Sequence, residues 1–159
     1  MKILGIDPGY GRMGFGCIET HKTGWNCLGV GVLTSPKGEK FERRLSDLQK
    51  DLEALLNEFN PDIMAVEKLF FAQNTTTAMR VAEARGVALC AAGTRGIEVR
   101  ELTPAQVKKA VTGNGRADKR AIQMMVKTLL GLPRAPRPDD AADALAIALA
   151  ASSALVSKS

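Results

Sequence analysis

The stretch KILGIDPG at residues 2–9 decides the fold of this chain. Its apolar run predicts a buried strand that ends on a carboxylate, Asp7, and is followed by turn residues. A second stretch, IMAVE at residues 63–67, repeats the pattern and ends on Glu67. If the two strands are parallel neighbours, both carboxylates emerge at the same edge of the sheet, where open α/β sheets place their ligand sites.

The segments around these two strands carry strand and helix patterns in a definite order. Two Gly-rich stretches, residues 13–19 and 26–33, predict strands that complete an antiparallel three-stranded start. Thr103 and Gln106 resemble a capping box. Further elements are expected as a strand over 97–102 and as helices over 41–59, 74–92, 104–111, 117–130 and 139–155. This order predicts an α/β fold, with a mixed five-stranded sheet and helices packed on its faces.

Length and composition limit the class of protein. The chain has 159 residues, which suits a single domain over 1–159, and no apolar run approaches the roughly 20 residues needed to span a bilayer. The three cysteines fit neither a disulfide framework nor a zinc site, and we expect Cys17 and Cys90 in the core. Without a signal peptide pattern, the cytoplasm is the expected location. The only histidine, His21, lies in a polar turn, which argues against histidine-based acid–base chemistry.

Positive charge is concentrated in one part of the chain. The formal net charge is +5, but residues 100–137 contain nine Lys or Arg and two acidic residues, a surplus of +7. A basic face of this kind is a candidate surface for a phosphate backbone. A set of solvated helix faces explains the charge equally well.

Acidic residues also open the last predicted helix. Asp140 and Asp143 are three positions apart and share a helix face. We expect the Asp139 side chain to point about a third of a turn away from this face. If these carboxylates converge with Asp7 and Glu67, they favour Mg²⁺ or Mn²⁺. Two such ions roughly 3.5–4 Å apart can hold the attacking and leaving oxygens of phosphodiester hydrolysis. Singly, each acid is more simply a turn residue or a first-turn acid favoured by the helix dipole.

Six short motifs follow one another along nearly the whole chain. Three are acidic, namely ILGIDPG at 3–9, AVE at 65–67 and DAADALAIA at 140–148. The others are AEARGV at 82–87 and two basic motifs, QVK at 106–108 and ADK at 117–119. In this order and at these spacings, they closely resemble the motifs of the RuvC family of Holliday junction resolvases, a branch of the RNase H-like superfamily.

The resemblance implies an RNase H-like homodimer that cuts four-way DNA junctions in recombination and repair. Its paired symmetric nicks would leave 5′-phosphate and 3′-hydroxyl ends. Lys108 and Lys119 would contact the region of the scissile phosphate. Mg²⁺, for which Mn²⁺ substitutes, would be bound as two ions by four acids, namely Asp7, Glu67, Asp140 and Asp143. The implied partners are a junction-binding protein and a ring-shaped branch-migration ATPase, in the bacterial cytoplasm.

Further residues are candidates for contact with DNA. Phe70 matches a family position that projects toward the junction. Stacking of its ring on an unpaired base there would contribute about 1–3 kcal/mol to binding. We expect Phe71 to pack inside the protein, although either ring could belong to the core or to the dimer interface. Contacts with the phosphate backbone are expected from Lys108, Lys109, Arg116, Lys119 and Arg120.

The dimer surface is less directly indicated. The Ala-rich helix over 74–92 is the candidate, because small residues allow close contact and Val81 and Val87 add apolar area. Ordinary packing of this helix against the sheet is an alternative of nearly equal weight.

Two other functions compete with junction cutting. The stretch GIDPG at 5–9 also resembles the first phosphate loop of actin-like ATPases and sugar kinases, but those proteins need two such domains. The chain could also be a junction-binding module whose acids are structural. In that case, Asp7→Asn would impair junction binding rather than cleavage.

Overall fold

The computed structural model describes residues 1–69 and 75–156, and in this part of the chain strands and helices follow one another in the expected order. The strands are β1 (Lys2–Asp7), β2 (Arg12–His21), β3 (Gly24–Thr34), β4 (Ile63–Glu67) and β5 (Glu98–Leu102). The helices are α1 (Phe41–Phe59), α2 (Thr75–Thr94), α3 (Pro104–Thr112), α4 (Lys119–Leu129) and α5 (Asp139–Val156). Among the described residues, no helix is both long and apolar enough to cross a membrane.

The strands form one mixed sheet in the order β3-β2-β1-β4-β5. The first three strands pair antiparallel, whereas β4 is parallel to β1 and β5 is parallel to β4. In the β1–β4 pair, Ile6 lies opposite Val66, so Asp7 and Glu67 follow at the same level of the sheet. The prediction of a mixed five-stranded α/β sheet is confirmed.

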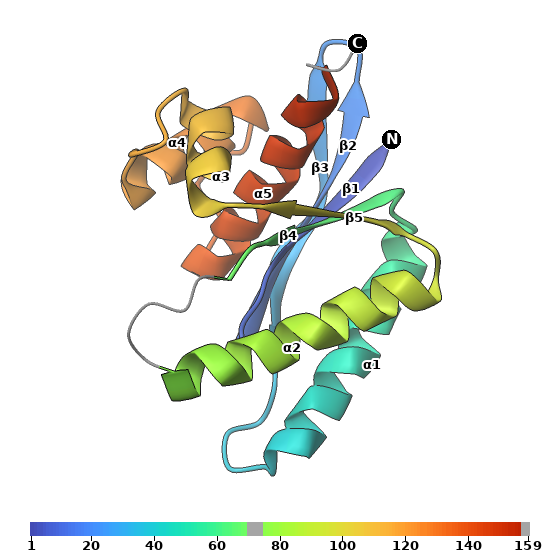
Figure 1. Cartoon of the computed structure of the whole chain (residues 1–159). Helices are drawn as coiled ribbons and strands as arrows, with labels where there is room; N and C mark the ends of the chain where they lie inside the picture. Colours follow the sequence, from blue (N-terminus) through green and yellow to red (C-terminus); the bar gives the residue numbers. More distant parts are fainter. Residues whose placement is uncertain (70–74, 157–159) are drawn as a thin grey trace.

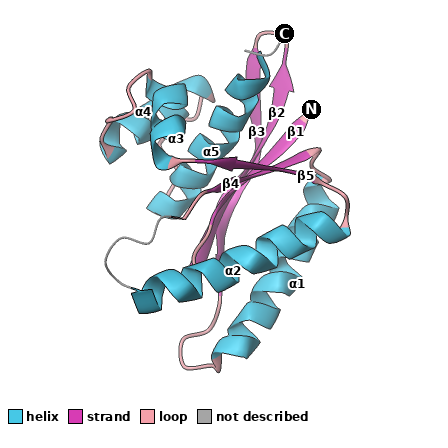
Figure 2. Ribbon diagram, viewed as in Figure 1, coloured by secondary structure: helices cyan, strands magenta, loops and turns pink. Residues whose placement is uncertain are grey.

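Helices cover both faces of this sheet (Figures 1 and 2). The helices α1 and α2 lie on one face, and α3, α4 and α5 lie on the other. Successive side chains of a strand point to opposite faces. In β1, accordingly, Ile3 packs into the core on the α5 side, while Leu4 and Ile6 pack into the core on the α1 side. Continuing this alternation directs Asp7, and likewise Glu67 in β4, toward the face that carries α3 and α5.

Glycines let α5 lie directly on β1 and β2. A Cβ atom added to Gly5 would lie 2.0 Å from the carbonyl oxygen of Ala144, and one added to Gly14 would lie 2.0 Å from that of Asp140. Only glycine permits so close an approach of helix and strand backbones. Because Gly14 pairs with Asp7 across the β1–β2 ladder, the first turn of α5 is fixed beside the end of β1.

Capping residues set the starts of α3 and α4. The Thr103 hydroxyl accepts a hydrogen bond from the Gln106 backbone N–H at 3.1 Å, and the Gln106 side chain accepts one from the Thr103 N–H at 2.8 Å. The expected capping box is therefore confirmed. In contrast, α4 begins at Lys119 rather than at Ala117, because the Asp118 side chain caps the helix.

Two expectations for single side chains have different outcomes. Cys17 is buried in the core, as expected, but Cys90 is exposed, and the prediction that it is a core residue is wrong. The reason is that α2 buries the face carrying Ala84, Ala88 and Ala91, and Cys90 lies on another face. His21 is exposed, as expected, but it is the last residue of β2 and directly precedes the turn.

Candidate active site

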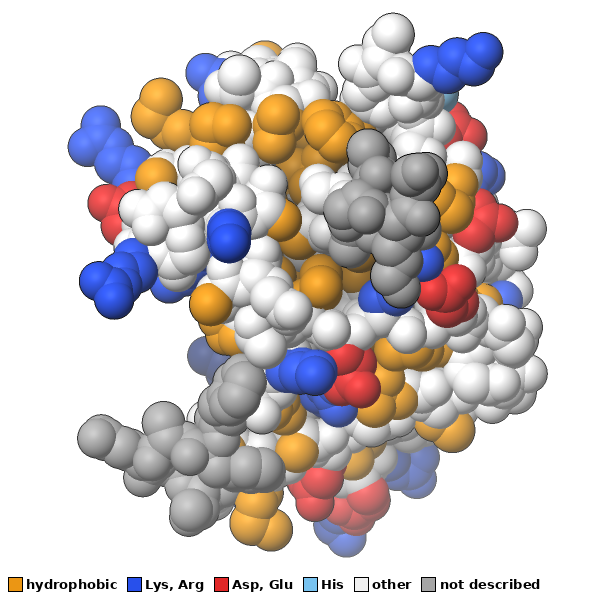
Figure 3. Space-filling model, turned by 45° about the horizontal axis from the view of Figure 1, so that its top comes forward, with side chains coloured by type: hydrophobic (Ala, Val, Ile, Leu, Met, Phe, Trp, Pro, Cys, Tyr) orange, Lys and Arg blue, Asp and Glu red, His pale blue; other side chains and the backbone are white. Residues whose placement is uncertain are grey.

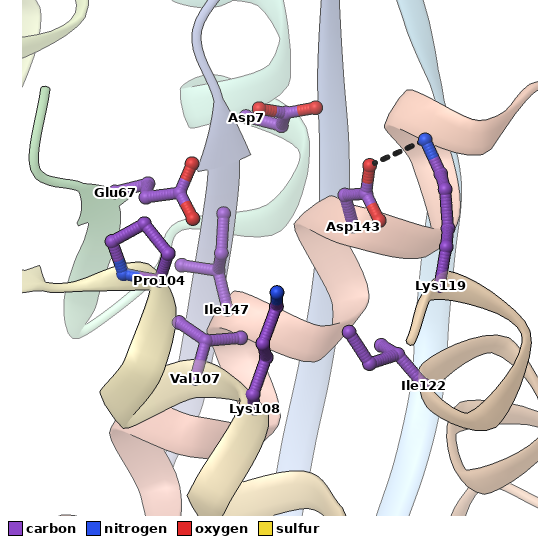
Figure 4. Close-up of a pocket in the computed structure, with 9 residues that line it drawn as sticks. All are labelled: Asp7, Glu67, Pro104, Val107, Lys108, Lys119, Ile122, Asp143 and Ile147. Atoms are coloured by element: carbon purple, nitrogen blue, oxygen red, sulfur yellow. Dashed lines mark ion pairs between the residues drawn. The ribbon is translucent and has the colours of Figure 1, made fainter. Parts of the chain in front are cut away.

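A cavity of about 230 Å³ opens where β1 and β4 end, and acidic and basic side chains line it (Figure 4). Asp7 and Glu67 enter it from the ends of the two strands, and Asp143 faces them from α5. Two lysines, Lys108 of α3 and Lys119 of α4, complete the polar lining. The apolar side of the cavity is formed by Pro104, Val107, Ile122 and Ile147.

The carboxylates of this cavity repel one another in the absence of a cation. Burial, followed by repulsion from Asp143, Glu67 and Asp140, raises the pKa of Asp7 from 3.8 to about 7. Burial and repulsion from Asp143 also raise the pKa of Glu67, against the attraction of Lys108. Burial of a carboxylate and a nearby like charge both disfavour its ionised form. The cavity therefore favours a bound cation that restores the ionised carboxylates.

One lysine bridges two acids at the start of α5. Lys119 Nζ lies 3.4 Å from Asp143 Oδ2 and 3.2 Å from Asp139 Oδ2. Although burial lowers it, pairing with Asp139 and Asp143 raises the pKa of Lys119 overall, and hydrogen bonding to Lys119 lowers the pKa of Asp139. The prediction that Asp139 points away from Asp143 is wrong. Residues four apart are also neighbours on a helix surface, so Asp139 lies beside Asp143 on the flank opposite to Asp140.

Asp140 lies at the margin of the cavity and is not among its lining residues. Its carboxylate forms an ion pair with the Arg12 guanidinium at the start of β2. It is still close enough to Asp7 to raise the pKa of that carboxyl. Arg12 is not among the site residues predicted from the sequence. The available signal was its place in the predicted β1–β2 hairpin, two positions before the residue that pairs with Asp7.

The remaining candidates for DNA contact lie outside the cavity. Lys109, Arg116 and Arg120 are exposed on α3, on the connection to α4 and on α4 itself, and none of them is a lining residue. Figure 3 shows lysine and arginine side chains gathered over the region of these two helices. Phe70 and Phe71 lie outside the described residues, so the expectations for these two rings stay predictions.

The donor set of the cavity fits a hard divalent cation. Carboxylate oxygens are the ligands that Mg²⁺ and Mn²⁺ prefer, and the raised pKa values reflect burial and mutual repulsion of the carboxylates, which a bound cation offsets. Within residues 1–69 and 75–156, no three acidic, histidine or cysteine side chains are already spaced to hold a metal ion. The carboxylates of the cavity fit the ion in charge and donor type.

A sheet of this order, with carboxylates at the ends of its two central parallel strands and on the final helix, defines a nuclease of the RNase H-like class. Residues 3–151 match the sequence model of a family described as "Crossover junction endodeoxyribonuclease RuvC". The chain belongs to this family. The membership confirms the resemblance and favours the endonuclease over both alternative functions considered from the sequence.

Known proteins similar to this chain agree with the assignment. Crossover junction endodeoxyribonuclease RuvC of Thermomicrobium roseum is 50% identical over 149 residues, which cover 94% of this chain and 91% of the relative. The same-named protein of Rubrobacter xylanophilus is 51% identical over 92% of this chain and 82% of the relative. T. thermophilus RuvC in complex with a Holliday junction substrate superposes with a TM-score of 0.94 at 34% identity, covering 99% of this chain and 96% of that one.

Proposed function

We propose that this chain is a divalent-metal-dependent endonuclease that resolves four-way DNA junctions. The observation that carries the proposal is the convergence of Asp7, Glu67 and Asp143 with two lysines in one cavity at the carboxyl ends of β1 and β4. The similar T. thermophilus protein, which was solved with a Holliday junction, supports the choice of substrate. Paired nicks would leave 5′-phosphate and 3′-hydroxyl ends.

Four acids would hold the metal, namely Asp7, Glu67, Asp140 and Asp143. We propose Mg²⁺ as the metal, with Mn²⁺ as a substitute and two ions per site, since two ions suit phosphodiester hydrolysis. Bound there, the ions would activate the attacking water and stabilise the charge that develops on the phosphate. Asp140 would have to turn from Arg12 toward the cavity to join the other three acids.

The two lysines would bind the scissile phosphate from either side of the cavity. The Lys108 ammonium points into the space between Glu67 and Asp143, and Lys119 lies beside Asp143 (Figure 4). A lysine binds phosphate as a positive point charge. The apolar side of the cavity would exclude water around the reacting atoms, which strengthens these electrostatic contacts.

The other DNA contacts would position the junction without reading its sequence. Lys109, Arg116 and Arg120 are exposed beside the cavity and suit contacts with the phosphate backbone. Phe70 remains our candidate for stacking on an unpaired base at the crossover. The proposed cellular partners are a junction-binding protein and a branch-migration ATPase in the bacterial cytoplasm.

A homodimer would supply the two matched cuts that a two-fold symmetric junction needs. We retain α2 as the candidate dimer helix. Its inward face buries Ala84 and Ala88, so on this side α2 packs against the rest of the domain, which is the alternative to a dimer interface. Its outer face leaves Met79, with 59% of its surface exposed, and Gly86, which has no atom within 4 Å of an added Cβ. This outer face supports the dimer proposal.

The test compares a synthetic four-way junction with a linear duplex, each incubated with Mg²⁺, Mn²⁺ or EDTA. We expect cutting of the junction alone, and only with metal. The isosteric changes Asp7→Asn, Glu67→Gln, Asp140→Asn and Asp143→Asn should each nearly abolish cutting while junction binding persists in a gel-shift assay. Asp51→Asn, at an exposed acid on α1, is the matched control and should cut normally. Equal cutting of both substrates, or full activity with EDTA, would refute the proposal.

A further inference from the structure

A second hollow, of about 610 Å³, lies next to the active site on the other side of Asp140. We call it the Arg12 groove. Its lining comes from segments far apart in the sequence, namely the β1–β2 turn with Tyr10, the start of β2 with Arg12, the end of β3 and the β3–α1 connection with Lys37, α2, and the start of α5 with Asp140. Asp140 lines this groove rather than the catalytic cavity, so the two hollows meet at this residue.

The wall of the Arg12 groove is held by hydrogen bonds between segments far apart in the sequence. Ser35, which is 8% exposed, donates from its hydroxyl to the Tyr10 carbonyl oxygen at 3.1 Å. Arg44 Nε donates to the Ser35 hydroxyl oxygen at 2.9 Å, and Arg44 Nη2 donates to the Tyr10 carbonyl oxygen at 3.3 Å. The groove is therefore a fixed feature of the fold.

Positive charge dominates this groove. Arg12 and Lys37 line it, and the Arg44 and Arg80 guanidinium groups lie 5.4 and 5.7 Å from the centre of the Tyr10 ring. Among the described lining residues, Asp140 is the one acid, and Arg12 neutralises it. Cationic side chains thus stand on both sides of the catalytic cavity, because Lys109, Arg116 and Arg120 lie beside it on α3, α4 and their connection. A polyanionic strand that crosses the cavity would meet cations at both ends of its path.

The Arg12–Asp140 pair joins a movable partner to an anchored one. The Arg12 side chain is 51% exposed, whereas that of Asp140 is 27% exposed. The Asp140 backbone is fixed against Gly14, where an added Cβ would lie 2.0 Å from the Asp140 carbonyl oxygen. A guanidinium group also matches a phosphate with two parallel hydrogen bonds, as it matches a carboxylate. Arg12 can therefore leave Asp140 for a phosphate without any change in the backbone.

We propose that the Arg12 groove binds the sugar–phosphate backbone of the cleaved strand, and that Arg12 exchanges Asp140 for a backbone phosphate when the strand enters. The exchange frees the Asp140 carboxylate to turn toward Asp7 and complete the acidic site. Strand binding and metal binding are thereby coupled, and the full acidic site assembles only when DNA is in place. This inference rests on the proposed function, because it assumes that the cavity receives a DNA strand.

The first test measures junction binding in EDTA, where no cutting occurs. Arg12→Ala and Lys37→Ala should each weaken binding about fivefold or more and reduce the slope of its salt dependence by about one. Lys22→Ala, in the β2–β3 turn at the other end of the sheet, is the control and should change neither. Asp140→Asn should tighten binding, because it releases Arg12, and should lose this effect in the Arg12→Ala background. Unchanged binding by Asp140→Asn would overturn the exchange.

The second test measures Mn²⁺ binding by calorimetry without DNA. Arg12→Ala should bind Mn²⁺ about fivefold more tightly, which is the scale of one exposed ion pair. Arg12→Lys, which keeps the charge, and Lys37→Ala, which removes a groove charge that does not contact Asp140, should match the parent protein. Weaker Mn²⁺ binding by Arg12→Ala would overturn the proposal, because Arg12 would then only position Asp140. Neither readout depends on cutting, so a protein that passes both tests yet never cuts would contradict only the proposed function.

Discussion

Asp7→Asn should stabilise the metal-free protein in a pH-dependent manner while it abolishes cutting. Burial and repulsion from the neighbouring acids raise the pKa of Asp7 from 3.8 to about 7 in the folded protein. Because the folded-state pKa is the higher one, ionisation of this carboxyl opposes folding. The cost is absent below the unfolded-state pKa, grows as pH rises to about 7, and stays constant above it. Asparagine keeps the shape of the side chain and removes that cost.

The size of the effect follows from the pKa difference. Each pKa unit corresponds to about 1.4 kcal/mol, so the shift of Asp7 sets an upper limit of about 4 kcal/mol above pH 7. Asp7 is half-buried, and contact with water brings the expected gain to about 2–3 kcal/mol. For a domain of this size, each kcal/mol shifts the melting temperature by about 2–4 °C. Asp7→Asn should therefore melt roughly 4–12 °C higher at pH 8, and the gain should be smaller at pH 5.

The assay is thermal unfolding followed by circular dichroism in EDTA, at several pH values between 5 and 9. Asp51→Asn, at an exposed acid on α1, controls for the loss of one negative charge and should show no such pH-dependent gain. Added Mg²⁺ should raise the melting temperature of the parent protein at pH 8 more than that of Asp7→Asn. A gain that is the same at every pH, or that shrinks as pH rises, would refute the assignment of the cost to Asp7 ionisation.

The remaining predictions concern the lysines, the first turn of α5 and the assembly. Asp140→Asn should reduce the single-turnover cutting rate far more than Asp139→Asn does. Asp139→Asn should slow cutting only several-fold, because it removes one of the two carboxylate partners of Lys119. Equal losses of cutting rate would mean that both acids bind metal. Lys119→Ala should slow cutting more than it weakens junction binding. Arg120→Ala should mainly weaken binding and reduce its salt dependence in a filter-binding titration. Identical behaviour of the two variants would indicate one undifferentiated basic patch. Light scattering at micromolar concentration should give a dimer, and a monomer that still linearises a supercoiled cruciform in one binding event would contradict the paired-site argument.

The strand part of the site is predictable from the sequence, and the helix part is predictable only in outline. Asp7 and Glu67 are predictable because each ends an apolar run, and parallel neighbouring strands bring their ends together. Spacing along a helix also places Asp140 near Asp143. It does not say which flank of Asp143 faces the cavity, because residues three and four positions away lie on either side of it. That choice depends on how α5 crosses β2 at Gly14, which no local pattern encodes.

The cation partners of these acids escape prediction for the same reason, and they determine how the site behaves without metal. Arg12 forms an ion pair with Asp140, and Lys119 forms ion pairs with both Asp139 and Asp143. A lysine bound to Asp143 alone would compete more strongly with a metal ion for that carboxylate. Because the exposed Asp139 also pairs with the Lys119 ammonium group, this group stays beside the cavity but is held less tightly by Asp143. A metal ion can then bind the Asp143 carboxylate more easily. An acid outside the proposed metal site can thus still set the balance between the lysine and the metal.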